Sequence, residues 1–356
     1  MGNVRQNEGI VDDLDLLRMM TRDAERAPDL YRPGPYWDRK SRRACKELSR
    51  HGLAGFRGID SGVATSFGDN PLVDIRSAYR SGGKDSLKRA LTALPLFKDI
   101  FQAQANVSAQ LFEEATFFKN EFFRASPRVE ELLSKYPLIK IDTTKGGCAS
   151  SLETSGVSVS HHYLQLLDTL DIVMSCLRRD SLAGQTVLEI GGGFGANAHL
   201  MVDLFGARKV IYLDIAPNLY VGTQYLKSFY GEAVHDYRVV KNRALHFRDD
   251  DSLEIYCLLP NQIESVGAPI DIFHNAHSFV EMPERVVRNY AAMVSSRLTQ
   301  EKGAVSLVTY DGFDLSTTLD PEFLATLFDG PCRSLTAESL TPGRCNYHFL
   351  FGAVEN

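Results

Sequence analysis

The stretch VLEIGGGFG, residues 187–195, decides the fold, because an apolar run there leads directly into a glycine-rich turn. The next five residues, ANAHL, favour a helix. Glycine can adopt positive φ, and it lets a ligand approach the backbone without meeting a Cβ atom. A strand, a glycine turn and a helix in this order predict a ligand crevice at the carboxyl end of a parallel strand.

Strands and helices alternate on the C-terminal side of this turn. Apolar runs predict strands at residues 186–190, 209–214, 253–258, 270–275, 304–310 and 345–352, and helices begin at Ala196, Pro217 and Pro283. Alternation of this kind predicts a largely parallel sheet with helices on both faces. The fold class is therefore α/β and Rossmann-like.

The N-terminal part has a different hydrophobic pattern. Between residues 85 and 135 apolar and aromatic residues recur at helical spacing, which predicts packed helices. We predict three regions: a mainly helical region, residues 1–150, that covers the cleft and binds substrate; a bridging helix, residues 151–184; and the ligand-binding domain, residues 185–356.

The composition of the chain argues against some classes of binding partner. The net charge of −6 argues against binding to nucleic acid, and no apolar run approaches the ~18 residues that span a membrane. The first residues lack the apolar core of a signal peptide, so we expect a cytoplasmic protein with a small-molecule substrate. The six cysteines form no C-x-x-C pair, which argues against a disulfide framework or a zinc site. A homodimer is left open.

Two carboxylates indicate what the crevice binds. Asp214 ends the next strand, about 20 residues beyond the turn, where an acidic residue can accept hydrogen bonds from ribose hydroxyls. Glu189 precedes the first glycine and suits a cation, such as the sulfonium and ammonium of S-adenosylmethionine. Gly191, Gly193 and Gly195 are spaced G-x-G-x-G, and they miss the G-x-G-x-x-G of dinucleotide sites. S-adenosylmethionine is therefore favoured over NAD.

Residues 189–195 and Asp214 resemble the first two motifs of class I S-adenosylmethionine-dependent methyltransferases. More narrowly, LEIGGGFGANAHL, LLPNQI and HNAHSFVEMPERVVRNY resemble the sugar O-methyltransferases of nanchangmycin-type biosynthesis. The similarity covers about residues 150–310. It implies a seven-stranded sheet whose last strand is antiparallel. It also implies a set of cofactor contacts: Glu189, Gly191, Gly193, Gly195, Asp214, Pro260, Asn261, Gln262 and Asn275.

The reaction expected from this resemblance is methyl transfer to a hydroxyl of a sugar-like metabolite. An alcohol acceptor needs a general base, and His277, just after the fourth main strand, is the first candidate. Glu281 in the same loop is the second catalytic candidate. Candidates for binding the acceptor are His274, Glu284, Tyr310 and Asp311.

Two alternatives remain. The carboxylates of this loop could instead orient a cationic acceptor, which would make the chain an N-methyltransferase for a free amino acid or guanidinium compound such as arginine. The chain could also be a nucleotide-binding protein without catalysis. No compact ligand motif predicts a metal site, although Asp311 with Asp314 or His274 could supply ligands.

Overall fold

The computed structural model describes residues 9–53, 55–58, 104–241, 243–310, 319–341 and 344–352, with the backbone alone for residues 104–112. The chain divides into two compact units. We call them the sheet unit (Met1–Ala54, Thr169–Ala337 and Asn346–Asn356) and the insert unit (Gly55–Asp168 and Glu338–Cys345). The predicted region boundaries at residues 150 and 185 do not coincide with this division.

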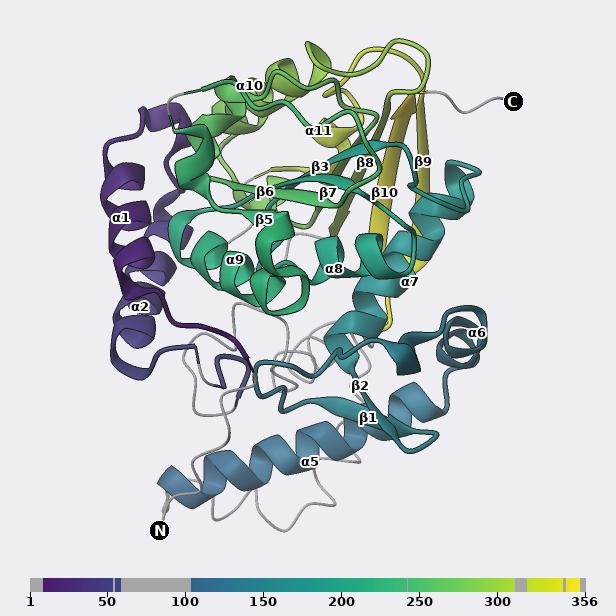
Figure 1. Ribbon diagram of the computed structural model, residues 1–356. Helices are drawn as coiled ribbons and strands as arrows, with labels where there is room; N and C mark the ends of the chain where they lie inside the picture. Colours follow the sequence, from purple (N-terminus) through teal and green to yellow (C-terminus); the bar gives the residue numbers. More distant parts are fainter. Residues whose placement is uncertain are drawn as a thin grey trace. The chain divides into compact units, whose positions relative to one another are not determined.

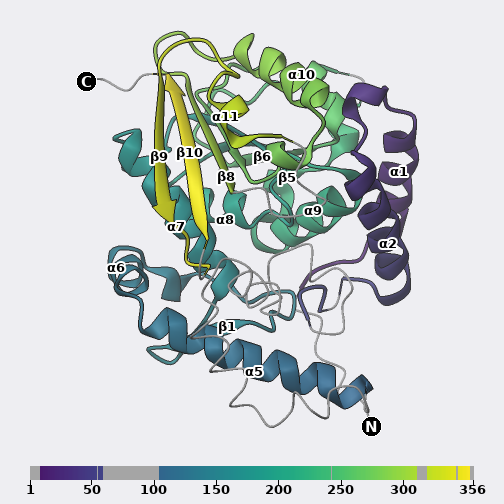
Figure 2. The ribbon, with the colours of Figure 1, turned by 180° about the vertical axis from the view of Figure 1, so that it is seen from behind.

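The first two helices belong to the sheet unit. Helices α1 (Leu14–Glu25) and α2 (Pro35–His51) pack against α9 (Ala216–Tyr230), and Figures 1 and 2 show the three side by side. The Tyr220 hydroxyl fixes this contact, because it donates to Asp12 Oδ1 (2.8 Å) and accepts from the Asp13 backbone N–H (3.1 Å). The charged helical pattern before residue 51 predicts helices, but it does not reveal their partner.

The sheet has eight strands in the order β5-β6-β4-β3-β7-β8-β10-β9. Strands β3 to β8 are mutually parallel, and β10 runs antiparallel to β8. The Rossmann-like prediction is therefore confirmed, as is the antiparallel last strand. In chain order the strands are β3 (Thr186–Ile190), β4 (Lys209–Leu213), β5 (Val234–His235), β6 (Glu254–Leu258), β7 (Ile272–Ala276), β8 (Ala304–Tyr310), β9 (Cys332–Glu338) and β10 (Cys345–Gly352).

The prediction of seven strands was wrong by one. The two-residue strand β5 extends the sheet beyond β6, and two residues are too few to show an alternating pattern. At the other edge of the sheet, Figure 2 shows β10 between β8 and β9. Strand β9 is largely exposed, so it lacks the apolar run by which the inner strands were predicted.

Helices cover both faces of the sheet. On one face, Val287 and Val294 of helix α10 (Glu284–Ser295) share an apolar core with Leu188 and Ile190 of β3. On the other face, the end of α7 (His161–Cys176) packs against Val308 of β8. The remaining short helices of this unit are α8 (Ala196–Asp203), α11 (Pro321–Leu324), η1 (Asp29–Tyr31), η5 (Gly231–Ala233), η6 (Tyr237–Val240), η7 (Pro260–Ser265) and η8 (Phe279–Glu281).

The insert unit contains α5 (Gln104–Arg124), α6 (Pro127–Lys135), η4 (Leu138–Lys140) and the hairpin β1 (Ser151–Thr154) and β2 (Val157–Ser160). A bridging helix was expected over residues 151–184, but residues 151–160 form the hairpin and α7 begins only at His161. The turn of the hairpin has positive φ at Ser155 and Gly156, a conformation suited to tight hairpins. The helical pattern predicted for residues 85–103 lies outside the described residues.

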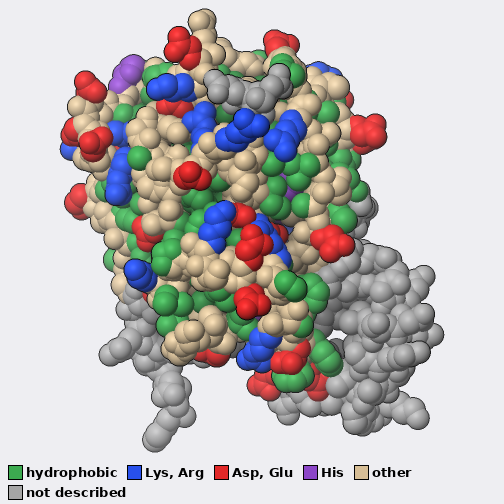
Figure 3. All heavy atoms as spheres, turned by 90° about the vertical axis from the view of Figure 1, so that its right-hand side faces the viewer, with side chains coloured by type: hydrophobic (Ala, Val, Ile, Leu, Met, Phe, Trp, Pro, Cys, Tyr) green, Lys and Arg blue, Asp and Glu red, His purple; other side chains and the backbone are tan. Residues whose placement is uncertain are grey.

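Charged side chains of both signs are interspersed over the described residues of the face shown in Figure 3. Across the described parts of the chain, no helix combines the length and apolar character needed to cross a membrane.

Candidate functional site

The glycine turn after β3 has the backbone that the sequence predicts. Gly191, Gly193 and Gly195 have φ values of +78°, +63° and +88°, which side chains rarely adopt. A Cβ atom at Gly191 would overlap the Ser278 hydroxyl, and one at Gly192 would lie 2.5 Å from Glu189 Oε2. Glycine is therefore required here both for conformation and for space.

Asp214, just beyond β4, holds this turn. Its Oδ2 accepts a hydrogen bond from the Gly193 N–H (2.8 Å). Its Oδ1 accepts from the Ile215 N–H (2.7 Å) and from the Asn218 side chain (3.2 Å). The carboxylate thus links the ends of two adjacent parallel strands at the place where the sequence predicts a ribose contact.

Tyr212 supports the turn from beneath. Its buried hydroxyl donates to the backbone carbonyl of Gly193 and lies 3.2 Å from that of Asn218. Sequence reasoning missed both Tyr212 and Asn218. The position of Asn218 one helical turn after Asp214 is the signal that could have identified it.

Glu189 and Asp214 form a buried acidic pair. Burial, with a contribution from Asp214, raises the pKa of Glu189 from 4.5 to about 7. Burial, with a contribution from Glu281, raises the pKa of Asp214 from 3.8 to about 7. Within the described parts of the chain neither carboxylate forms an ion pair, and Glu189 Oε2 has no hydrogen-bond partner. Buried anions of this kind favour a cationic ligand, because a cation would offset the cost of their desolvation.

The loop after β6 holds three of the predicted cofactor contacts, Pro260, Asn261 and Gln262. Pro260 begins the helix η7, and Gln262 accepts from the Leu259 N–H (2.9 Å) and donates to the Tyr237 carbonyl (2.9 Å). Gln262 therefore shapes the loop. Among the described residues, Asn261 Oδ1 is buried without a hydrogen-bond partner, so this atom is available to a ligand.

Asn275, another predicted cofactor residue, ties the loop after β7 to β3. Its Nδ2 donates to the Ile190 carbonyl (2.8 Å) and to the Ser278 hydroxyl (2.6 Å). Its Oδ1 accepts from the Phe279 N–H (3.2 Å). These bonds fix the geometry of the turn and occupy the side chain.

His277 follows β7 directly and has a left-handed backbone, with φ of +69°. Its N–H donates to the Val308 carbonyl (2.7 Å), and its Nε2 lies 3.3 Å from Asn346 Oδ1. The ring also packs against Tyr310, with 5.3 Å between centroids. Positive φ in a residue other than glycine is strained, and such strain is often found at functional positions.

Glu281 accepts hydrogen bonds from one indole N–H and one phenol hydroxyl. Its Oε2 accepts from the Trp37 indole N–H (2.7 Å) and its Oε1 from the Tyr310 hydroxyl (2.7 Å). Trp37 lies on α2, so part of the predicted N-terminal region contacts the loop after β7. Sequence reasoning missed Trp37 and Asn346, because neither lies near a motif.

The other residues predicted to bind the acceptor differ in their burial. His274 is buried within β7, and its Nδ1 lies 3.3 Å from the Ser306 hydroxyl. Burial, with the nearby His348 and His277, lowers the pKa of His274 to about 3. Glu284 is exposed in the first turn of α10, where it pairs with Arg288 at 2.7 Å. Asp311 lies outside the described residues.

No protein-family model and no curated protein matches the sequence. Among solved structures, a mutant of MtNAS in complex with S-adenosylmethionine is 15% identical, with a TM-score of 0.38 over 89% of this chain and 98% of that one. The T. thermophilus 16S rRNA methyltransferase RsmC, in complex with AdoMet and guanosine, is 17% identical, with a TM-score of 0.36 over 56% of this chain and 48% of that one.

Mycolic acid cyclopropane synthase CmaA1, complexed with SAH and CTAB, is also 17% identical, with a TM-score of 0.29 over 42% of this chain and 45% of that one. The chain thus spans less than half the length of CmaA1 and of RsmC. All three TM-scores lie below 0.5. The fold is therefore assigned from the strand order, and it is the α/β Rossmann-like fold with an added edge strand.

Proposed function

We propose that the chain is an S-adenosylmethionine-dependent methyltransferase that acts on a hydroxyl group of a small, polar, sugar-like metabolite. The observation that carries this proposal is the buried pair Glu189 and Asp214, which flanks a glycine turn and has no cationic partner among the described residues. S-adenosylmethionine carries two positive groups and a ribose, which match these carboxylates in charge and hydrogen bonding.

Each part of the cofactor has a candidate partner. Glu189 would hold the cationic methionine end, and Asp214 would accept from the ribose hydroxyls. The unpartnered Asn261 Oδ1 would accept a hydrogen bond from the adenine amino group. The positive-φ glycines would let the cofactor lie against the backbone.

When bound, the cofactor supplies an electrophilic methyl group for an in-line displacement, and the protein must orient the acceptor and remove its proton. His277 is the base we propose, since the loop after β7 presents its imidazole at the carboxyl end of the sheet. Glu281 is less suited to clamp a cationic acceptor, because both of its oxygens already accept hydrogen bonds. Its charge nevertheless keeps the N-methyltransferase as the second candidate.

Calorimetry with S-adenosylmethionine and S-adenosylhomocysteine tests the cofactor. We expect both to bind, and a protein that binds neither would be a scaffold without this function. A mass-shift screen with S-adenosylmethionine then tests the acceptor. A gain of one methyl group on sugars or nucleotide sugars supports the proposal, whereas methylation of arginine or another free amino acid favours the second candidate.

The affinity for S-adenosylmethionine should fall as the pH falls through about 7. Glu189 and Asp214 have pKa values of about 7, so they are ionised above this pH and protonated below it. A cation binds the ionised form, which predicts roughly tenfold weaker binding at pH 6 than at pH 8 for one such carboxylate. Calorimetric titration at both values measures the change. The Glu189→Gln variant should bind more weakly and with a shallower pH dependence, and an affinity independent of pH would contradict this account of the site.

A further inference from the structure

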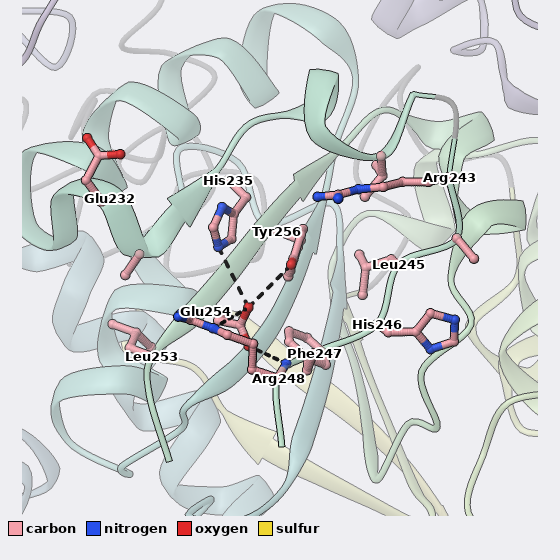
Figure 4. A pocket seen from close by; sticks show the side chains of 13 residues that line it. Glu232, His235, Arg243, Leu245, His246, Phe247, Arg248, Leu253, Glu254 and Tyr256 are labelled. Carbon is pink, nitrogen blue, oxygen red and sulfur yellow. Dashed lines mark hydrogen bonds and ion pairs between the residues drawn. The ribbon is translucent and has the colours of Figure 1, made fainter. Parts of the chain in front are cut away.

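A pocket of about 680 Å³ lies away from the proposed cofactor site, at the opposite end of β6. Glu254 and Tyr256 line it from the amino half of β6, His235 lines it from the edge strand β5, and residues 243–248 form a wall (Figure 4). The residues proposed to contact adenine follow the carboxyl end of the same strand. The volume is in the range of sites that hold a small organic molecule.

Aromatic rings form one side of this pocket. His235 packs against Tyr256 with 4.6 Å between ring centroids and 30° between planes. Phe247 meets Tyr256 edge-on, at 5.4 Å and 71°. Leu245 and Val240 add apolar surface. A flat apolar body would find partners here, since aromatic groups favour stacked or edge-on contacts.

The one buried carboxylate of the pocket is already neutralised. Glu254 Oε2 lies 2.8 Å from Lys209 Nζ and accepts from the Arg248 backbone N–H, also at 2.8 Å. Its Oε1 lies 3.3 Å from Arg248 Nε. Arg248 and Lys209, which also pairs with Asp250 at 3.3 Å, therefore compensate the charge of Glu254, and Glu254 has little remaining capacity to attract a cationic ligand.

Arg243 supplies a further positive charge. Its Nε donates to the Val239 carbonyl (2.8 Å), which anchors the side chain, and its two terminal nitrogens have no hydrogen-bond partner in the described part of the chain. Figure 4 shows Arg243 on one side of His235 and Tyr256 and Arg248 on the other, with Glu232 apart from this group. Burial lowers the pKa of His235 below its ordinary value, Glu254 partly opposes this shift, and Arg248 and Arg243 add to it. The ring is therefore neutral at pH 7, and the arginines provide the positive charge. His235 Nε2 is buried and lies 3.9 Å from Glu254 Oε1, with no hydrogen-bond partner among the described residues.

We propose that this pocket binds a planar aromatic carboxylate. Its ring would contact His235, Phe247 and Tyr256, and its carboxylate would accept hydrogen bonds from the guanidinium of Arg243. This second ligand site is independent of methyl transfer, because its residues share no side chain with the proposed cofactor and acceptor sites.

Three probes of one shape test the proposal: 2-naphthoate, its neutral amide 2-naphthamide, and the cation 2-naphthylmethylammonium. Calorimetry on the full chain without S-adenosylmethionine should show naphthoate binding about tenfold or more tighter than the amide, and the cation binding weakest. Arg243→Gln should lower the affinity for naphthoate to about that for the amide and leave the amide unchanged. Because the readout is direct binding, its failure would leave the methyltransferase proposal untouched.

Arg18→Gln is the matched control, since Arg18 is an exposed arginine on α1 that pairs with Asp15. It should leave all three affinities unchanged. Phe247→Leu should weaken naphthoate and naphthamide together, which would place the ring in this pocket. Equal affinity for naphthoate and naphthamide would overturn the proposal. So would tighter binding of the cation, or naphthoate binding that Arg243→Gln does not change.

Discussion

Replacing His277 by asparagine is expected to lower kcat by about 100- to 10,000-fold while the affinity for S-adenosylmethionine stays nearly unchanged. The change removes the imidazole that we propose takes the proton of the acceptor hydroxyl. Asparagine is chosen because it tolerates the left-handed backbone of this position better than most residues. Steady-state turnover and calorimetric titration of the cofactor measure the two quantities.

Glu281→Gln serves as the comparison for this variant. For a hydroxyl acceptor it should cost less than His277→Asn, because it disturbs only the contacts with Trp37 and Tyr310. For a guanidinium acceptor the order should reverse, since a charged clamp would be lost while the base would matter less. A His277→Asn variant that keeps more than about a tenth of the wild-type kcat would remove the histidine from the mechanism.

Asp214→Ala is expected to weaken S-adenosylmethionine binding by about 1 to 3 kcal/mol, or roughly 5- to 150-fold. The variant loses the predicted ribose contact, and it also loses the acceptor of the Gly193 N–H that holds the glycine turn. Calorimetric titration measures the affinity, and thermal unfolding measures what the turn contributes to stability.

Asp271→Ala is the matched control for this change. Asp271 directly precedes β7, at the amino end of the parallel strands, and it accepts from the Thr186 N–H (2.9 Å) and the Thr299 hydroxyl (3.0 Å). Both variants lose a carboxylate that binds a backbone N–H, so both should lower the melting temperature. Only Asp214→Ala should weaken binding of S-adenosylmethionine. Equal affinities for S-adenosylmethionine in the two variants would remove Asp214 from the site.

The inner sheet could be predicted from the sequence because its strands are buried on both faces. The predicted strand at residues 186–190 coincides with β3, and those at 304–310 and 345–352 coincide with β8 and β10. An apolar run of this kind has few alternative structures. Strands β5 and β9 and the hairpin of β1 and β2 escaped prediction, because they are short or exposed and carry no such run.

The candidate site divides in the same way. The glycine turn and Asp214 could be predicted because their spacing is local, within about 20 residues. Trp37 could not, since its contact with Glu281 joins residues 244 positions apart. Tertiary contacts of this length follow from the packing of α2 and leave no periodic signal in the sequence.

The packing of α1 on α9 has a consequence for synthesis of the chain. The hydrogen bond between Asp13 and Tyr220 joins positions separated by 207 residues. At about 5 to 20 residues per second, a ribosome needs roughly 10 to 40 s to synthesise the chain between α1 and α9. During this interval Leu16, Leu17 and Met20, which are buried in the folded protein, lack the surface of α9. The nascent chain therefore presents an apolar helix face that a chaperone can recognise, and this part of the fold is completed only after synthesis has passed α9.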